Sequence, residues 1–222
     1  DTWIRYFFKL TNMDNILILS PHTDDAELGC GGTIAKFQKE GKNILWLAFS
    51  TASESLPAHL APDTLKNEFT SVAMHLGLSK SQFRTYDYKV RKLSESRQEI
   101  LEELVKVRNE FKPDLVIGPS LNDYHQDHQV ISNEMIRAFK TNASILCYEL
   151  PWNHIEFKTQ FFVQLDESDL KMKNEMLQFY KSQVVVNRHY FTKDFVNGIA
   201  CTRGTQINTK YAEAFEVIRW RL

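Results

Sequence analysis

The stretch "ILILSPHTDDAELGCGGTIAKF", residues 16–37, decides the fold of this chain. It opens with the apolar run Ile16–Ser20, which predicts a strand buried in the middle of a sheet. It ends in Thr33–Glu40, whose spacing predicts a helix that Gly41 terminates. A strand followed at once by a helix is the repeating unit of a parallel sheet. The turn between them carries a histidine and three carboxylates: His22, Asp24, Asp25 and Glu27.

Strand and helix patterns alternate along most of the remaining chain. Further strands are predicted at Ile44–Phe49, Gln82–Thr85, Asp114–Gly118 and Ser144–Tyr148. Helices are predicted at Thr64–Leu76, Ser94–Phe111, about 125–140, Asp169–Gln183 and Lys210–Arg219. The alternation over about the first 150 residues predicts an α/β, Rossmann-like fold, with a mostly parallel sheet and helices on both faces. A length of 222 residues suits a single domain over residues 1–222.

Two polar loops stand at positions where such a sheet binds ligands. Ligands of open α/β sheets lie beyond the carboxyl ends of the strands. Pro21–Gly32 follows the first strand, and Pro119–His128 follows the strand Asp114–Gly118. The second loop again combines histidines with carboxylates: Asp123, His125, Asp127 and His128. If the sheet brings both loops together, one crevice holds three histidines and several carboxylates.

This mixture of side chains is typical of a metal site. Catalytic zinc is usually held by three His, Asp or Glu ligands, which leave one position for water. The metal lowers the pKa of that water to about 7, and a neighbouring carboxylate can act as general base. His22 and Asp25 can point the same way on a tight turn, and either His128 or His125 would complete the set. Nitrogen and oxygen ligands without a thiolate suit Zn²⁺, and also Fe²⁺ or Mn²⁺.

Each loop also has a simpler interpretation. Asp24 or Asp25 could cap the following helix, and the two histidines of 125–128 could lie at a solvated helix start. "GCGG" before a helix could bind a phosphate, although its acidic neighbours would repel an anion. These interpretations explain one residue or one loop at a time, whereas a metal site explains both loops together.

Two motifs resemble those of a known family. "PHTDDAELGCGGTIAK" resembles the P/A-H-P-D-D-E signature of the LmbE-like (PIG-L) zinc-dependent de-N-acetylases, and "HQDH" resembles their H-x-D-H motif. "NEFTSVAMHLGL" and "YAEAFEV" are similar to weaker family patterns, so the resemblance extends over most of the chain. Members of this family remove acetyl groups from N-acetylglucosamine-type sugars and their conjugates, and others act on N-acyl antibiotics.

The resemblance implies a role for each site residue. Three residues match the metal ligands of the family: His22, Asp25 and His128. Asp24 matches the general base that activates the metal-bound water. His125 matches the histidine that stabilises the oxyanion or protonates the leaving amine. Asp127 matches a carboxylate that orients a motif histidine from behind.

Some positions depart from the family pattern. Thr23 replaces the usual proline, and Ala26 stands where an acid commonly follows the Asp pair. An arginine that often precedes the glutamate of the second helix is absent, and Leu65 and Lys66 lie there. These changes leave the residues at the metal and base positions as in the family. They affect positions that could contact the substrate. Lys66 and Asp87, near strand ends, are hypothetical sugar contacts, and each also suits a solvated surface charge.

The composition of the chain limits the kinds of partner and compartment that we expect for it. The formal net charge is −1 and no basic stripe is interleaved with aromatic residues, which argues against a nucleic-acid partner. No apolar run reaches the roughly 20 residues that span a bilayer, and the opening "DTWIRYFFKL" lacks a signal-peptide layout. Cys30, Cys147 and Cys201 stand far apart, which fits a reducing compartment, so we expect a cytoplasmic protein. Whether the chain forms a homo-oligomer is left open.

These features together predict a metal-dependent hydrolase. It would remove an N-acetyl group from an amino sugar or its conjugate by means of a metal-activated water. One alternative is a metal-dependent amidase that acts on a non-sugar N-acyl small molecule. The other is a non-catalytic module that binds a metal or a sugar. Asp24 argues against the module, because binding alone needs no base beside the metal ligands.

Overall fold

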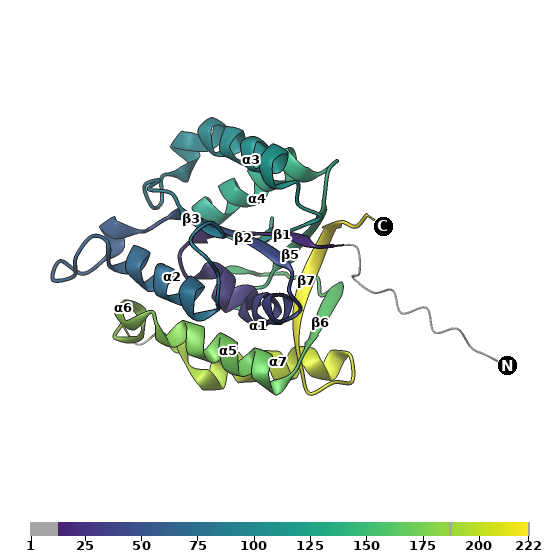
Figure 1. Ribbon diagram of the computed structural model, residues 1–222. Helices are drawn as coiled ribbons and strands as arrows, with labels where there is room; N and C mark the ends of the chain where they lie inside the picture. Colours follow the sequence, from purple (N-terminus) through teal and green to yellow (C-terminus); the bar gives the residue numbers. More distant parts are fainter. Residues whose placement is uncertain (1–12, 187, 222) are drawn as a thin grey trace.

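A seven-stranded sheet covered by helices on both faces forms the centre of the computed structural model, which describes residues 13–186 and 188–221 (Figure 1). The strand order is β3-β2-β1-β4-β5-β7-β6. The strands are β1 (Asn15–His22), β2 (Asn43–Ser50), β3 (Phe83–Thr85), β4 (Leu115–Pro119), β5 (Ser144–Tyr148), β6 (Phe161–Leu165) and β7 (Tyr211–Arg219). β1 to β5 pair in parallel, and β7 pairs antiparallel with both β5 and β6. The structure therefore confirms the predicted α/β class.

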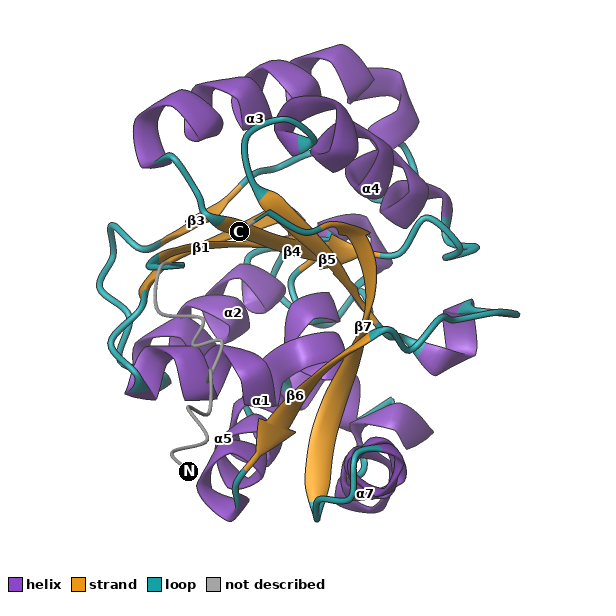
Figure 2. Cartoon of the chain, turned by 90° about the vertical axis from the view of Figure 1, so that its right-hand side faces the viewer, coloured by secondary structure: helices purple, strands orange, loops and turns teal. Residues whose placement is uncertain are grey.

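The helices form two layers. α3 and α4 cover one face of the sheet, and α1, α2, α5 and α7 lie on the other (Figures 1 and 2). The α-helices are α1 (Asp25–Lys39), α2 (Thr64–His75), α3 (Arg97–Phe111), α4 (Gln126–Phe139), α5 (Glu167–Gln178), α6 (Lys181–Val184) and α7 (Lys193–Gln206). The 3₁₀ turns are η1 (Ser53–Ser55), η2 (Leu93–Ser96), η3 (Pro151–Asn153) and η4 (His189–Phe191).

β1 explains why helices are needed on both faces. Successive side chains of a strand point to opposite faces of the sheet. Ile16 and Ile18 pack in the core beneath α1 and α2, whereas Leu17 and Leu19 pack in the core beneath α3 and α4. The apolar run of β1, Ile16–Leu19, is therefore buried on both sides, as in other parallel sheets.

The end of the chain differs from the prediction. The helix predicted at Lys210–Arg219 is wrong, because this segment is the strand β7, which pairs with β5 on one side and β6 on the other. The pattern of polar and apolar residues was misleading here, because the two charged residues Glu213 and Glu216 are buried and only 5% and 4% exposed. We predicted neither β6 nor α7, and the single helix predicted at Asp169–Gln183 is broken into α5 and α6.

α1 begins at Asp25, well before the predicted start at Thr33, and it is kinked at Cys30, where φ is −144°. After the kink, the carboxylate of Glu213 accepts hydrogen bonds from the backbone N–H groups of Gly32 at 3.0 Å and Thr33 at 2.6 Å. The N–H groups of Gly32 and Thr33, at the end of "GCGG", are therefore occupied by a side chain of β7 and are not available to a phosphate.

No helix in residues 13–186 and 188–221 is both long enough and apolar enough to cross a membrane.

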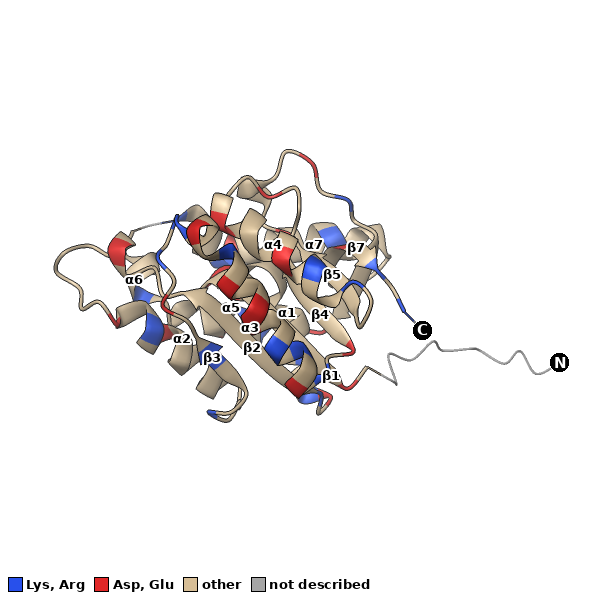
Figure 3. Cartoon of the chain, turned by 90° about the horizontal axis from the view of Figure 1, so that it is seen from above, with Lys and Arg blue, Asp and Glu red and all other residues tan. Residues whose placement is uncertain are grey.

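Seen from above, basic and acidic residues are interspersed along the helices and strands (Figure 3). Arg97 of α3 and Arg137 of α4, for example, both pair with the buried carboxylate of Glu134. These three charges of α3 and α4 are thus paired with one another.

Candidate active site

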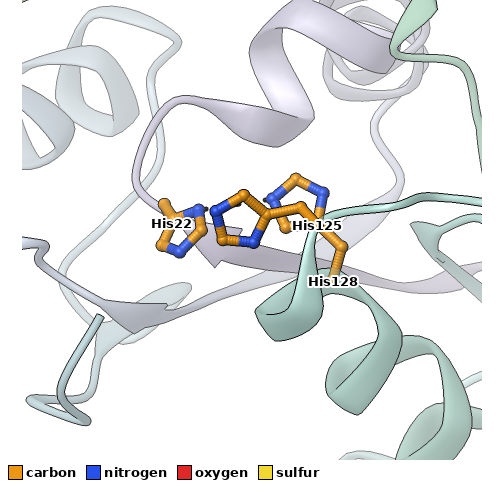
Figure 4. Close-up of side chains that lie close together, drawn as sticks. All are labelled: His22, His125 and His128. Carbon is orange, nitrogen blue, oxygen red and sulfur yellow. Dashed lines mark hydrogen bonds between the residues drawn. The ribbon is translucent and has the colours of Figure 1, made fainter. Parts of the chain in front are cut away.

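The two charged loops meet at one end of the sheet. β1 and β4 are adjacent parallel strands, but the chain leaves β1 toward β2 on one side and β4 toward β5 on the other. A crevice forms where the strand order reverses in this way. His22 is the last residue of β1, and His125 and His128 lie at the start of α4. Figure 4 shows these three rings gathered in one place.

Three atoms from these loops form a compact triangle. Asp25 Oδ2 lies 3.1 Å from His22 Nδ1 and 3.2 Å from His128 Nε2, and the two nitrogens are 3.3 Å apart. Ligand atoms at about 2.0–2.1 Å from a tetrahedral zinc ion are separated from one another by about 3.3–3.4 Å. The triangle therefore fits three ligands of one metal ion, and all three residues are buried.

Two further aspartates hold the histidine rings from behind. Asp127 Oδ2 lies 2.9 Å from His22 Nε2, and Asp123 Oδ2 lies 2.7 Å from His128 Nδ1. An ionised carboxylate only accepts hydrogen bonds, so these ring nitrogens donate, and the nitrogens facing Asp25 are the ones able to bind a metal. The hypothesised orienting role of Asp127 requires a contact of this kind, and the role itself stays a prediction. Asp123 makes the equivalent contact, although we assigned no role to it from the sequence.

His125 lies beside the triangle, but its ring is held differently. It is the N-cap residue of α4, and its Nδ1 accepts a hydrogen bond from the backbone N–H of Asp127 at 3.2 Å. Burial and the neighbouring rings of His128 and His22 lower the pKa of His125 to about 4. The ring is therefore neutral near pH 7 and carries its proton on Nε2.

His125 also belongs to a second group of residues that lie close enough to hold a metal. Ligand atoms of His22, His125 and His128 all lie within 4.8 Å of one another. A metal ligand needs a free nitrogen lone pair. In His125 the lone pair of Nδ1 already accepts a hydrogen bond, and Nε2 is protonated. This arrangement favours Asp25 over His125 as the third ligand.

Carboxylates dominate the electrostatics of the triangle. Burial favours the neutral form of His22, but Asp25 and Asp127 outweigh burial and raise its pKa to about 9. In the same way, Asp25 and Asp123 raise the pKa of the buried His128 to about 10. Burial opposes the charge of Asp25, yet the two histidines hold its pKa well below the usual range. The crevice thus stabilises positive charge, and a metal ion would displace the ring protons that face Asp25.

Asp24 points into the pocket rather than capping the helix. It occupies the N-cap position of α1, but its side chain makes no capping hydrogen bond. Burial and the neighbouring charge of Asp25 raise the pKa of Asp24 to about 6. A carboxylate with this pKa is mostly ionised at pH 7 and binds a proton more readily than an ordinary one, which suits a general base.

The triangle lies in a pocket of about 250 Å³. Its walls include a group that the sequence analysis did not identify: Trp152, Asn153, Gln183, Arg188 and Tyr190. Trp152 and Asn153 follow β5, so the rule that ligands bind beyond strand ends would have found them. Arg188 and Tyr190 lie between α6 and α7, a region in which the sequence pattern indicated nothing.

The structure does not bring Lys66 and Asp87 into this pocket. The two residues line a separate hollow beside the start of α2, together with Asp63 and Tyr88. Of the residues assigned roles from the sequence, the other six meet around the triangle: His22, Asp24, Asp25, His125, Asp127 and His128.

A comparison with known proteins agrees with the site. The family model described as PIG-L, GlcNAc-PI de-N-acetylase, matches residues 17–139, more than half of the chain, and this span includes both loops. The chain therefore belongs to the PIG-L family of de-N-acetylases, as its motifs predicted.

Individual relatives extend this comparison. The chain is 26% identical over 176 residues to the uncharacterized deacetylase YaiS of Escherichia coli strain K12, which covers 75% of this chain and 90% of YaiS. It is 24% identical to the diacetylchitobiose deacetylase of Thermococcus kodakarensis, over 93% of this chain and 84% of the relative. The solved N,N′-diacetylchitobiose deacetylase of Pyrococcus horikoshii shares the fold with a TM-score of 0.76 at 20% identity, over 94% of this chain and 85% of the other.

Proposed function

We propose that this chain is a metal-dependent hydrolase that removes the N-acetyl group from an N-acetylglucosamine-type sugar or its conjugate. The observation that carries the proposal is the triangle of His22 Nδ1, Asp25 Oδ2 and His128 Nε2, since orienting aspartates leave both nitrogens able to bind a metal. Zn²⁺ suits this ligand set, and so do Fe²⁺ and Mn²⁺. When bound, such an ion polarises an amide carbonyl and lowers the pKa of a water molecule.

Asp24 transfers the protons in this proposal. Amide hydrolysis adds a hydroxyl group to the acetyl carbon and breaks the bond from that carbon to nitrogen. One proton must therefore leave the attacking water and one must reach the departing amine. Asp24 accepts the first proton and then delivers it to the nitrogen, because a pKa near 6 lets one group serve as base and then as acid near neutral pH.

His125 stabilises the developing negative charge. As the carbonyl becomes tetrahedral, its oxygen gains charge, and a prepositioned donor lowers the barrier. His125 has a neutral ring with a protonated Nε2 that can donate to this oxygen. A ring whose pKa is about 4 does not give up an additional proton at pH 7, so we assign proton delivery to Asp24.

The size of the pocket supports a small acetylated group. Ligand pockets usually measure about 300–1,000 Å³, so a pocket of about 250 Å³ admits the acetylated end of a substrate rather than a whole conjugate. The family description and the names of the relatives support a sugar substrate. Lys66 and Asp87 remain predicted sugar contacts, for a part of the conjugate that extends into the hollow beside α2. All three cysteines are free, which supports a cytoplasmic location.

An acetate-release assay tests the proposal. Purified chain, treated with a chelator and then resupplied with Zn²⁺, Fe²⁺ or Mn²⁺, is given N-acetylglucosamine, N,N′-diacetylchitobiose and an N-acetylated amino acid. We expect acetate from a sugar only after a metal is restored. Release from the amino acid alone would favour the non-sugar amidase. Stoichiometric metal binding without release from any substrate would favour the non-catalytic module.

A further inference from the structure

Two aromatic side chains form a rigid pair in the wall of the pocket. Trp152 of η3 and Tyr190 of η4 stack with their ring centroids 4.0 Å apart and their planes 12° apart. Phe195 of α7 contacts the same indole, with centroids 5.9 Å apart. Despite these contacts Trp152 stays 38% exposed. A large aromatic surface that is both fixed and open to a pocket is suited to binding a ligand.

The loop that carries Trp152 is attached to the metal-binding loop. Asn153, the next residue, donates from Nδ2 to Asp123 Oδ2 at 3.3 Å, and its carbonyl accepts a hydrogen bond from Tyr124 N at 3.0 Å. Asp123 also orients His128 through the same oxygen. The aromatic pair is therefore held at a defined position relative to the triangle.

Arg188 adds hydrogen-bond donors to the same wall. Its guanidinium donates to the hydroxyl of Tyr190 and lies 5.8 Å from the centre of that ring. Among the described residues that line the pocket it is the only lysine or arginine. No ion pair joins Arg188 to a carboxylate in the described part of the chain, so most of its five N–H groups are available to a ligand.

We infer that Trp152, Tyr190 and Arg188 form a subsite for a second, uncharged sugar ring, next to the ring whose acetyl group reaches Asp24. An aromatic face matches the C–H face of a pyranose, and the guanidinium matches its hydroxyl oxygens. A neutral ring fits better than an anion, because the positive charge of Arg188 already interacts with the carboxylate of Asp24 in the same pocket. The inference rests on the proposed function for the identity of the first ring.

Ligand binding to the Asp24→Asn variant, in which turnover is blocked, tests the subsite. Titration calorimetry with Zn²⁺ present gives the ratio of the affinities for N,N′-diacetylchitobiose and N-acetylglucosamine. We expect the disaccharide to bind more tightly. Adding Trp152→Ala should lower the ratio by about tenfold or more, since an aromatic side chain that a bound ligand covers usually carries much of the binding energy. Arg188→Lys should lower it less, because lysine keeps the charge and loses the planar fork.

Ile155→Ala is the matched control. Ile155 lies in the same loop, is 79% exposed and does not line the pocket. This variant should keep the wild-type ratio, and its thermal unfolding provides a reference for that of the Trp152 variant. A Trp152→Ala variant that folds normally and keeps the ratio would overturn the inference. Loss of affinity for uridine diphosphate N-acetylglucosamine, with the disaccharide unaffected, would also overturn it and indicate an anionic conjugate.

The acetate assay separates this inference from the proposed function. Acetate release by the wild-type chain together with an unchanged ratio in the Trp152 variant would leave the hydrolase in place and remove the subsite. Conversely, a ratio that falls in the Trp152 variant, when the wild-type chain releases no acetate, would support the subsite and contradict the hydrolase.

Discussion

The loops after β1 and β4 contain the same residue types but use them differently. In the β1 loop, the carboxylates of Asp24 and Asp25 face the pocket. In the β4 loop, the carboxylates of Asp123 and Asp127 face away from it and accept hydrogen bonds from histidine rings. One loop therefore presents oxygen atoms to a ligand, and the other sets the positions of the nitrogen atoms.

Asp25 and Asp127 show the difference most directly, because both contact His22. Asp25 Oδ2 lies 3.1 Å from Nδ1, and Asp127 Oδ2 lies 2.9 Å from Nε2 of the same ring. The carboxylate of Asp127 also accepts the backbone N–H groups of Arg91 and Leu93, at 2.5 and 3.2 Å. Both oxygens of Asp127 are occupied by these donors, whereas Asp25 Oδ2 accepts one backbone N–H group, that of His22 at 2.7 Å, and also faces His128 Nε2. The set of hydrogen-bond partners, not the residue type, separates a ligand from an orienting group.

The largest effect is expected from removing His128, the proposed metal ligand in the β4 loop. His128→Ala should lose most of its metal and at least about 10⁴-fold of its activity, since a bound metal supplies several kcal/mol of transition-state stabilisation. Elemental analysis after gel filtration measures the metal content. The exposed His59→Ala variant should keep the metal. One equivalent of metal still bound to the His128 variant would contradict the ligand assignment.

The next largest effect on activity is expected from Asp24→Asn, because this change removes the proposed proton acceptor from the β1 loop and leaves the triangle intact. We expect kcat to fall by about 10²–10⁴-fold with metal content unchanged. Acetate release and elemental analysis on the same preparation test both expectations. Near-normal turnover would show that Asp24 is not the base.

His125→Ala tests whether the third histidine is a donor or a ligand. Loss of one oxyanion donor should lower kcat by about 10²–10³-fold, whereas metal content and KM should change little. A higher KM with unchanged kcat would instead make His125 a substrate-binding residue. If the metal is lost, His125 belongs to the ligand set in place of Asp25 or His128.

The smallest effect is expected from the orienting carboxylates. Asp123→Asn and Asp127→Asn keep the size of the side chain but replace an acceptor oxygen, so each should weaken metal affinity or activity by about 10–100-fold. Competition with a coloured chelator measures the affinity, and the exposed Asp194→Asn variant is the control. Unchanged affinity and activity in both variants would remove the distinction between the two loops.

Much of the fold follows from local pattern alone. The run Ile16–Ser20 is apolar because both faces of β1 are covered, and β2, β3 and β4 are each followed by a helix with an apolar face. These signals lie within a few residues of one another, so the sequence could show them. The same reasoning placed the two charged loops at strand ends. It could not have recognised β7, because the two buried carboxylates of this strand accept hydrogen bonds from segments that are distant in the sequence.

By itself, the sequence determined the family, the α/β class and the collection of histidines and aspartates at two strand ends. Only the tertiary structure decided which atoms each of these side chains contacts. The β1 and β4 loops are about a hundred residues apart, and the roles of Asp25, Asp123 and Asp127 depend on contacts of about 3 Å with histidine rings. Trp152 and Tyr190 likewise meet only in the folded chain. A linear pattern records which groups are available, whereas hydrogen bonding and stacking depend on distances that only packing sets.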